Sequence, residues 1–204
     1  MRHRHFFPAV TLWISSFLVL SLVGCAGSPS ARFYLLSPTV TAKNEAVPPQ
    51  QGNCITLRIA RVTLPEYLNR PQIVTRTSEN NLALSDYNLW AEPLTDTFAR
   101  VLAENISRQI CTQKIMLSPG KTPGGWESRI EVEVFGMDGT LGKEAVLEAW
   151  WSVSRGAETA LSKRSRHSEP VNEKTYDALV RAQSRNIGAL SREIAEAIRK
   201  TGMQ

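Results

Sequence analysis

Residues 130–139 read Ile-Glu-Val-Glu-Val-Phe-Gly-Met-Asp-Gly, and this stretch decides the fold class. Isoleucine and valine alternate with glutamate over 130–134, which is the period of a strand with one face in the core and one in water. Gly136, Asp138 and Gly139 are residue types that favour turns, so we expect the chain to reverse there. A half-exposed strand followed by a turn predicts a strand meander.

Further strands are expected on both sides of this stretch. Downstream, 144–154 and 158–168 continue the meander and are joined at Arg155 and Gly156. Upstream, two short segments around the polar residues 78–80 are typical of a hairpin. The other strands are predicted at 33–36, 55–64, 72–77, 81–85 and 114–117.

Two segments carry apolar residues at steps of three and four, which predicts helices with one buried face. The first runs from Pro93 to Ile110, and proline is well tolerated at a first helical position. The second runs from about Glu173 to Lys200 and has charges on its other face. The order of strands and helices predicts an α+β fold, a two-layer domain whose mixed or antiparallel sheet is packed by these two helices.

The amino terminus is typical of a secreted bacterial lipoprotein. Basic residues at 1–5 precede the apolar run Phe6–Val23, the order of a secretory signal peptide. Leu-Val-Gly-Cys at 22–25 resembles the lipobox, in which the cysteine sulfur receives a diacylglycerol before cleavage. We therefore expect residues 1–24 to be removed and Cys25 to be lipidated. A retained membrane helix is the alternative, because the run approaches the roughly 20 residues that a span needs.

The lipid anchor defines the expected organisation of the chain. Three acyl chains would make attachment effectively permanent, and Ala26 stands where an aspartate is the usual inner-membrane retention signal. We expect anchoring in the inner leaflet of the outer membrane, facing the periplasm. Residues 25–53 are then the lipidated amino terminus, a short strand and a flexible linker rich in proline and polar residues, and 54–204 form the folded domain.

Charge does not favour nucleic acid as a partner. Loss of Arg2 and Arg4 with the signal peptide lowers Lys plus Arg from 24 to 22 against 19 acidic residues, so the formal charge falls from +5 to about +3. The remaining basic residues are spread along the chain. The basic run Lys163–His167 is expected to be a solvated strand face, with contact to anionic headgroups as the alternative.

Cys54 and Cys111 are the two cysteines left once Cys25 is acylated. A disulfide between them is expected in an oxidising compartment and would close a loop of roughly 60 residues. Two buried free thiols are the alternative.

The sequence predicts no catalytic, cofactor or metal site. His167 is the only histidine after residue 24, and the chain lacks a Gly-x-Ser-x-Gly elbow, a phosphate-binding loop and any usual zinc-ligand spacing. Trp150 and Trp151 are adjacent on a predicted strand and must face opposite sides. One is expected in the core, and the other either lies under a helix or is exposed at a binding surface.

Two motifs resemble the PqiC/YmbA family of ABC-type transport auxiliary lipoproteins. They are Leu-Pro-Glu-Tyr-Leu at 64–68 and Asn-Leu-Trp-Ala-Glu-Pro-Leu at 88–94, and their order with the lipobox and the final helix extends the resemblance over the mature chain. The resemblance implies a non-enzymatic accessory subunit of an MCE-type lipid-transport system. It implies as partners an MCE-family tunnel protein (PqiB-like) and further copies in a homo-oligomeric ring at the outer membrane.

Tyr67, Leu68 and Trp90 are the candidate contact residues, because large apolar side chains beside turns either cap a core or anchor an interface. For Trp90 the core position is favoured, since it precedes a helix start. Tyr67 and Leu68 could each lie in the core or at an interface, where they would contact a partner protein or lipid. A structural envelope lipoprotein that stabilises an outer-membrane complex without lipid transport is the alternative function.

Overall fold

Eight strands, two α-helices and one 3-10 helix make up the residues that the computed structural model describes, namely 29–39, 54–117, 128–156 and 158–201. From Ala31 on, these residues belong to one compact unit. The elements are, in chain order, β1 (Arg32–Tyr34), β2 (Ile55–Thr63), η1 (Glu66–Leu68), β3 (Gln72–Arg76), β4 (Leu82–Trp90), α2 (Leu94–Ser107), β5 (Thr112–Leu117), β6 (Ser128–Gly139), β7 (Glu144–Arg155), β8 (Glu158–Pro170) and α3 (Tyr176–Lys200).

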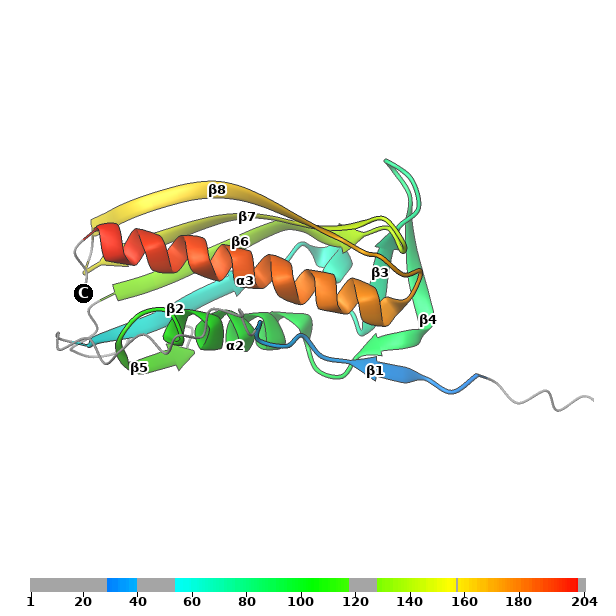
Figure 1. Cartoon of the computed structure of the whole chain (residues 1–204), viewed down its shortest axis with the longest axis horizontal. Coiled ribbons are helices and arrows are strands. Elements are labelled where there is room, and N and C mark those ends of the chain that lie inside the picture. The colour runs from blue at the N-terminus through cyan, green and yellow to red at the C-terminus, as the bar shows by residue number, and fades with distance from the viewer. Residues whose placement is uncertain (1–28, 40–53, 118–127, 157, 202–204) are drawn as a thin grey trace, which may run out of the picture. The chain divides into compact units, whose positions relative to one another are not determined.

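The strands form a five-stranded sheet in the order β5-β2-β6-β7-β8 and a three-stranded sheet in the order β1-β4-β3. β2 runs parallel to both β5 and β6, whereas β6, β7 and β8 form the antiparallel meander predicted from the sequence. α2 packs on β2 and β5, and α3 packs on β7 and β8, so both helices cover one face of the larger sheet (Figure 1). The predicted α+β fold with two main helices is confirmed.

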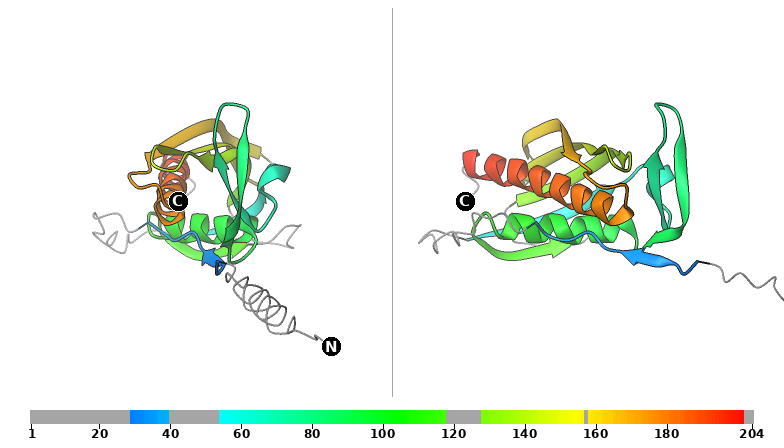
Figure 2. Two further views of the ribbon diagram at one scale, coloured as in Figure 1. Left: turned by 90° about the vertical axis from the view of Figure 1, so that its right-hand side faces the viewer. Right: turned by 45° about the vertical axis from the view of Figure 1, so that its right-hand side comes forward.

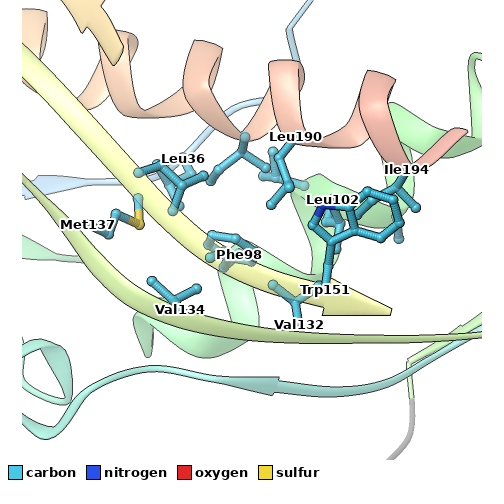
Figure 3. Close-up of a cluster of buried hydrophobic side chains, with 14 of the residues drawn as sticks. Leu36, Phe98, Leu102, Val132, Val134, Met137, Trp151, Leu190 and Ile194 are labelled. Atoms are coloured by element: carbon cyan, nitrogen blue, oxygen red, sulfur yellow. The ribbon is translucent and has the colours of Figure 1, made fainter. Parts of the chain in front are cut away.

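The core lies between the two helices and the five-stranded sheet (Figure 3). Trp151 is fully buried there, and its indole Nε1 donates a hydrogen bond of 3.0 Å to Ser165 Oγ. Trp150 points to the opposite face of β7 and is half-buried, as the alternation of a strand requires. The other core side chains labelled in Figure 3 are Leu36, Phe98, Leu102, Val132, Val134, Met137, Leu190 and Ile194.

The turn predicted at Gly136–Gly139 is wrong, because these residues continue β6 to Gly139. The register with β7 shifts between Val134 and Gly136, so a bulge absorbs the irregular residues without ending the strand. The chain reverses instead over residues 140–143, where Gly142 has a φ of +75° that glycine adopts without strain. Asp138 can stay within the strand because its carboxylate accepts hydrogen bonds from the side chains of Tyr67 and Arg76.

A disulfide joins Cys54 and Cys111, and this prediction is confirmed. The two residues stand directly before β2 and β5, which are parallel neighbours, and the Ile55 N–H donates to the Cys111 carbonyl over 3.1 Å. The parallel pairing therefore brings together two cysteines that are 57 residues apart.

β1 confirms the early strand and makes it part of the fold. It pairs in parallel with the end of β4, and the following Leu36 is 1% exposed in the core. Of the predicted linker only residues 37–39 are described. The rest of the linker, the signal peptide and Cys25 lie outside the described residues.

Candidate docking surface

The three candidate contact residues occupy different environments. Leu68 is 2% exposed and Trp90 8% exposed, so the structure places both in the core and neither offers a contact surface. For Trp90 this is the favoured position. Tyr67 is half-buried, and its phenol O–H donates to Asp138 Oδ2 over 3.0 Å. Of the three, Tyr67 alone has a polar end at the boundary between core and solvent.

Tyr67 belongs to a polar cluster that fixes η1 and the β3–β4 hairpin to β6. Arg76 at the end of β3 donates from Nε to Asp138 Oδ1 over 2.7 Å and from a terminal nitrogen to Oδ2 over 2.9 Å. Burial, the charge of Asp138 and the hydrogen bond to it raise the pKa of Tyr67 to about 12. The phenol therefore stays a neutral donor, and the cluster has a supporting role.

The basic run on β8 is largely paired within the domain. Lys163 forms an ion pair with Glu193 of α3, and Arg164 lies 2.8 Å from Glu148 on the outer face of the sheet. His167 Nε2 lies 3.2 Å from Glu193 Oε2. Burial alone would raise the pKa of Glu193, but hydrogen bonds from Lys163 and Ser165 outweigh it and lower the pKa. The structure thus favours the solvated-face interpretation of this run.

His167 lies beside a carboxylate that other groups also hold. Its neighbour Glu193 is held by Lys163 and by Ser165, whose oxygen accepts the indole proton of Trp151 and is buried. No group of three or more His, Cys, Asp or Glu that could hold a metal ion occurs among the described residues. Within the same residues, no helix is long and apolar enough to cross a membrane.

Residues 37–39 lie across both helices and are fixed by hydrogen bonds to each. The Ser37 N–H donates to Ser184 Oγ of α3 over 3.1 Å, and the Thr39 N–H donates to Asn105 Oδ1 of α2 over 3.0 Å. Gly188 makes the close approach possible, since a Cβ on it would lie 2.1 Å from Thr39 Oγ1. The segment that leads from β1 toward the rest of the chain is therefore part of the domain surface.

Between this segment and α3 lies a groove of about 410 Å³, which we call the β1 groove. One wall consists of residues 33–35 and 37–39, and the other of Asp177, Val180, Arg181, Ser184 and Arg185 on the first half of α3. In Figures 1 and 2, β1 passes below the start of α3 and beside the end of β4. Segments from opposite ends of the domain sequence thus form one surface.

The β1 groove combines exposed apolar side chains with two guanidinium groups. Phe33 is 65% exposed and Leu35 46% exposed, although both are large hydrophobic residues. Arg181 forms an ion pair with Asp177 within the groove, and Arg185 Nε lies 2.8 Å from Glu169. All four charged side chains are partly open to solvent. The surface therefore presents apolar and charged groups side by side.

The chain belongs to a family of transport lipoproteins. Residues 34–195 match the family described as ABC-type transport auxiliary lipoprotein component, which confirms the resemblance found in the sequence. The chain is 26% identical over 184 residues to the intermembrane transport lipoprotein PqiC of Escherichia coli (strain K12), covering 90% of this chain and 93% of PqiC. PqiC of Shigella flexneri matches equally.

Two crystal structures share the fold. One, of an uncharacterized protein, has a TM-score of 0.67 at 19% identity and covers 83% of this chain and 99% of its own. The other, of a Xanthomonas campestris protein, has a TM-score of 0.65 at 16% identity and covers 85% of this chain and 98% of its own. At these identities the likeness concerns the fold alone.

Proposed function

We propose that this protein is an outer-membrane-anchored, periplasm-facing lipoprotein that acts as a non-enzymatic accessory subunit of an MCE-type intermembrane lipid-transport system. Cys25 carries the acyl chains, and the domain docks the outer-membrane end of the transport tunnel as a homo-oligomeric ring. One observation carries the proposal: almost the whole chain aligns with a relative named an intermembrane transport lipoprotein.

The structure supports a docking role in two ways. The described residues contain no metal-binding cluster, and their one histidine is paired with a carboxylate that other groups already hold. The β3–β4 hairpin stands at one end of the larger sheet, and its turn extends beyond the body of the domain (Figure 2). The cluster of Tyr67, Arg76 and Asp138 ties the last residue of β3, directly before this turn, to β6, which supports its use as a contact element.

Cross-linking in intact cells tests the proposed partner. The tagged full-length lipoprotein is cross-linked and purified, and we expect to recover an MCE-domain protein. An unrelated tagged outer-membrane lipoprotein expressed at the same level serves as the control and should recover none. Repeated absence of an MCE protein from samples in which the lipoprotein is abundant would contradict the proposal.

Deletion separates the proposal from a purely structural envelope role. If the lipoprotein is a transport subunit, its deletion should cause the same sensitivity to detergents as deletion of the MCE partner. Cells that lack both proteins should then be no more sensitive than cells that lack one. A structural lipoprotein would instead give a defect that adds to that of the MCE deletion.

A further inference from the structure

We propose that the β1 groove binds a phospholipid of the leaflet in which Cys25 is anchored, with the acyl chains against Phe33 and Leu35 and the phosphate at Arg181 and Arg185. The inference rests on acylation of Cys25, which is part of the proposed function. It adds a lipid-binding site on the folded domain itself.

The length of the chain places the groove near the membrane. Phe33 lies eight positions after Cys25, and even a fully extended chain of that length spans at most about 29 Å. An acylated Cys25 lies at the bilayer surface, so Phe33 is held within about the thickness of one hydrocarbon core, roughly 30 Å, of that surface. Phospholipid is therefore the most abundant amphipathic molecule within reach of the groove.

The apolar side of the groove is suited to acyl chains. Phe33 has the largest exposed fraction of the large hydrophobic side chains in the described part of the chain, and Leu35 follows two residues later. Leu35 lies directly after the end of β1, and both side chains line the groove, so together they form its apolar side. In the parallel register Phe33 lies opposite the half-buried Leu89, which widens this surface onto β4. Contiguous exposed apolar groups of this kind mark interaction sites.

The polar side of the groove is suited to a phosphate. Arg181 and Arg185 are one helical turn apart on α3, which puts both guanidinium groups on the same side of the helix. A guanidinium binds phosphate oxygens through two parallel hydrogen bonds, and the side chains are 54% and 42% exposed, so a ligand can reach them. Asp177, one turn before Arg181 on α3, is the ion-pair partner of Arg181 and also lines the groove, where it can accept a hydrogen bond from an ammonium headgroup.

The size of the groove fits part of a lipid. A volume of about 410 Å³ falls within the range of roughly 300 to 1,000 Å³ typical of small-molecule sites. The groove therefore holds the headgroup and the first methylene groups, while the rest of the acyl chains remain in the leaflet or lie along the exposed face of Phe33. Binding of this kind would fix the orientation of the domain on the membrane.

Photo-cross-linking tests the site on the full-length lipoprotein in its own membrane. Phe33 is replaced by p-benzoylphenylalanine, and the matched control carries the same replacement at Phe135, which is 42% exposed on β6 and outside the groove. After irradiation and delipidation of the sample, intact-mass measurement should show an added mass equal to one phospholipid at position 33 and none at position 135.

A second pair of variants tests the phosphate contact. Arg181→Gln with Arg185→Gln, in the chain carrying the photo-cross-linker at 33, should lose the lipid adduct. Arg192→Gln, an exposed arginine of α3 outside the groove, should keep it. The double change also removes the exposed ion pairs of Arg181 with Asp177 and of Arg185 with Glu169, so circular dichroism and membrane fractionation must first show that the fold and the membrane attachment are retained.

Three results would overturn the inference. They are equal lipid adducts at 33 and 135, an adduct at 33 with another copy of the chain or with a different protein, and a lipid adduct that survives loss of both arginines. Labelling of Cys25 by palmitate is measured in the same cells. It distinguishes failure of the groove assignment from failure of the proposed function. If the label enters and no lipid adduct forms, the groove assignment alone is wrong.

Discussion

Replacing Gly188 by alanine is expected to destabilise the domain, although the same change stabilises most helices. Gly188 is buried inside α3, and alanine in a helix interior is ordinarily favoured over glycine by about 0.5–1 kcal/mol. Here the added Cβ would lie 2.1 Å from Thr39 Oγ1, 3.1 Å from its Cβ and 3.2 Å from its Cγ2. Rotation of the threonine cannot relieve the contact with its own Cβ, so residues 37–39 must move.

The magnitude follows from the two opposing effects. Overpacking of a well-packed site costs about 1–3 kcal/mol, and subtraction of the helix-propensity gain leaves a net loss of about 1 kcal/mol or somewhat more. In a Thr39→Gly background all three contacts vanish, while the backbone N–H of residue 39 can still donate to Asn105. Gly188→Ala should then stabilise the domain by about 0.5–1 kcal/mol. The effect of one mutation changes sign with the residue at position 39.

Urea unfolding of the four proteins, wild type, both single variants and the double variant, measures this coupling. A coupling energy of about 2 kcal/mol corresponds to a difference of about 1 M between the midpoint shifts in the two backgrounds, at an m-value of about 2 kcal/mol/M. If Gly188→Ala changes stability equally in both backgrounds, Thr39 does not pack on the helix as described, and one wall of the β1 groove is misplaced.

Three further predictions concern the rest of the fold. The double variant Cys54→Ser, Cys111→Ser should lose on the order of 4 kcal/mol in urea unfolding, because the disulfide closes a loop with a sequence separation of 57; an unchanged midpoint under non-reducing conditions would contradict this. Because the pKa of Tyr67 is about 12 when folded and about 10 when unfolded, its contribution to stability is complete below pH 10 and is lost as pH rises through 12. Tyr67→Phe should remove that part of the alkaline loss, and identical pH profiles would contradict the raised pKa that burial and Asp138 give Tyr67. Leu36→Ala should cost about 2–5 kcal/mol, whereas a cost near zero would mean that β1 and its flank are a tether outside the core.

Periodicity in the sequence was sufficient to predict the elements whose faces are amphipathic. The glutamates at 131 and 133, the two tryptophans at 150 and 151 and the apolar stripes of α2 and α3 each specify a local geometry, and the structure confirms these elements. The turn predicted at Gly136–Gly139 failed because turn-favouring residues also occur in bulges. Whether Asp138 ends a strand or stays within it depends on Arg76 and Tyr67, which are distant in the sequence.

Strand order and the β1 groove had no local signal. β2 lies between β5 and β6 through parallel pairings that follow long crossovers, and such neighbours cannot be inferred from alternation within one strand. The groove brings Ser37 against Ser184, 147 residues later. Leu68 and Trp90 look alike in the sequence as candidates for contact, yet both are core residues, since a large apolar group beside a turn satisfies either environment. One residue of the groove region carried a signal in the sequence: Gly188, a glycine within a strongly periodic helix, indicates that another segment passes close to the helix there.

The proposed role depends on a lipid attached at Cys25, which would hold the domain at a membrane. Labelled palmitate supplied to growing cells should be incorporated into the wild-type protein and not into a Cys25→Ser variant, with the wild-type product recovered in the outer-membrane fraction. Absence of label from the wild-type protein, or equal labelling of the variant, would contradict the anchor and with it the proposed position at the end of a transport tunnel.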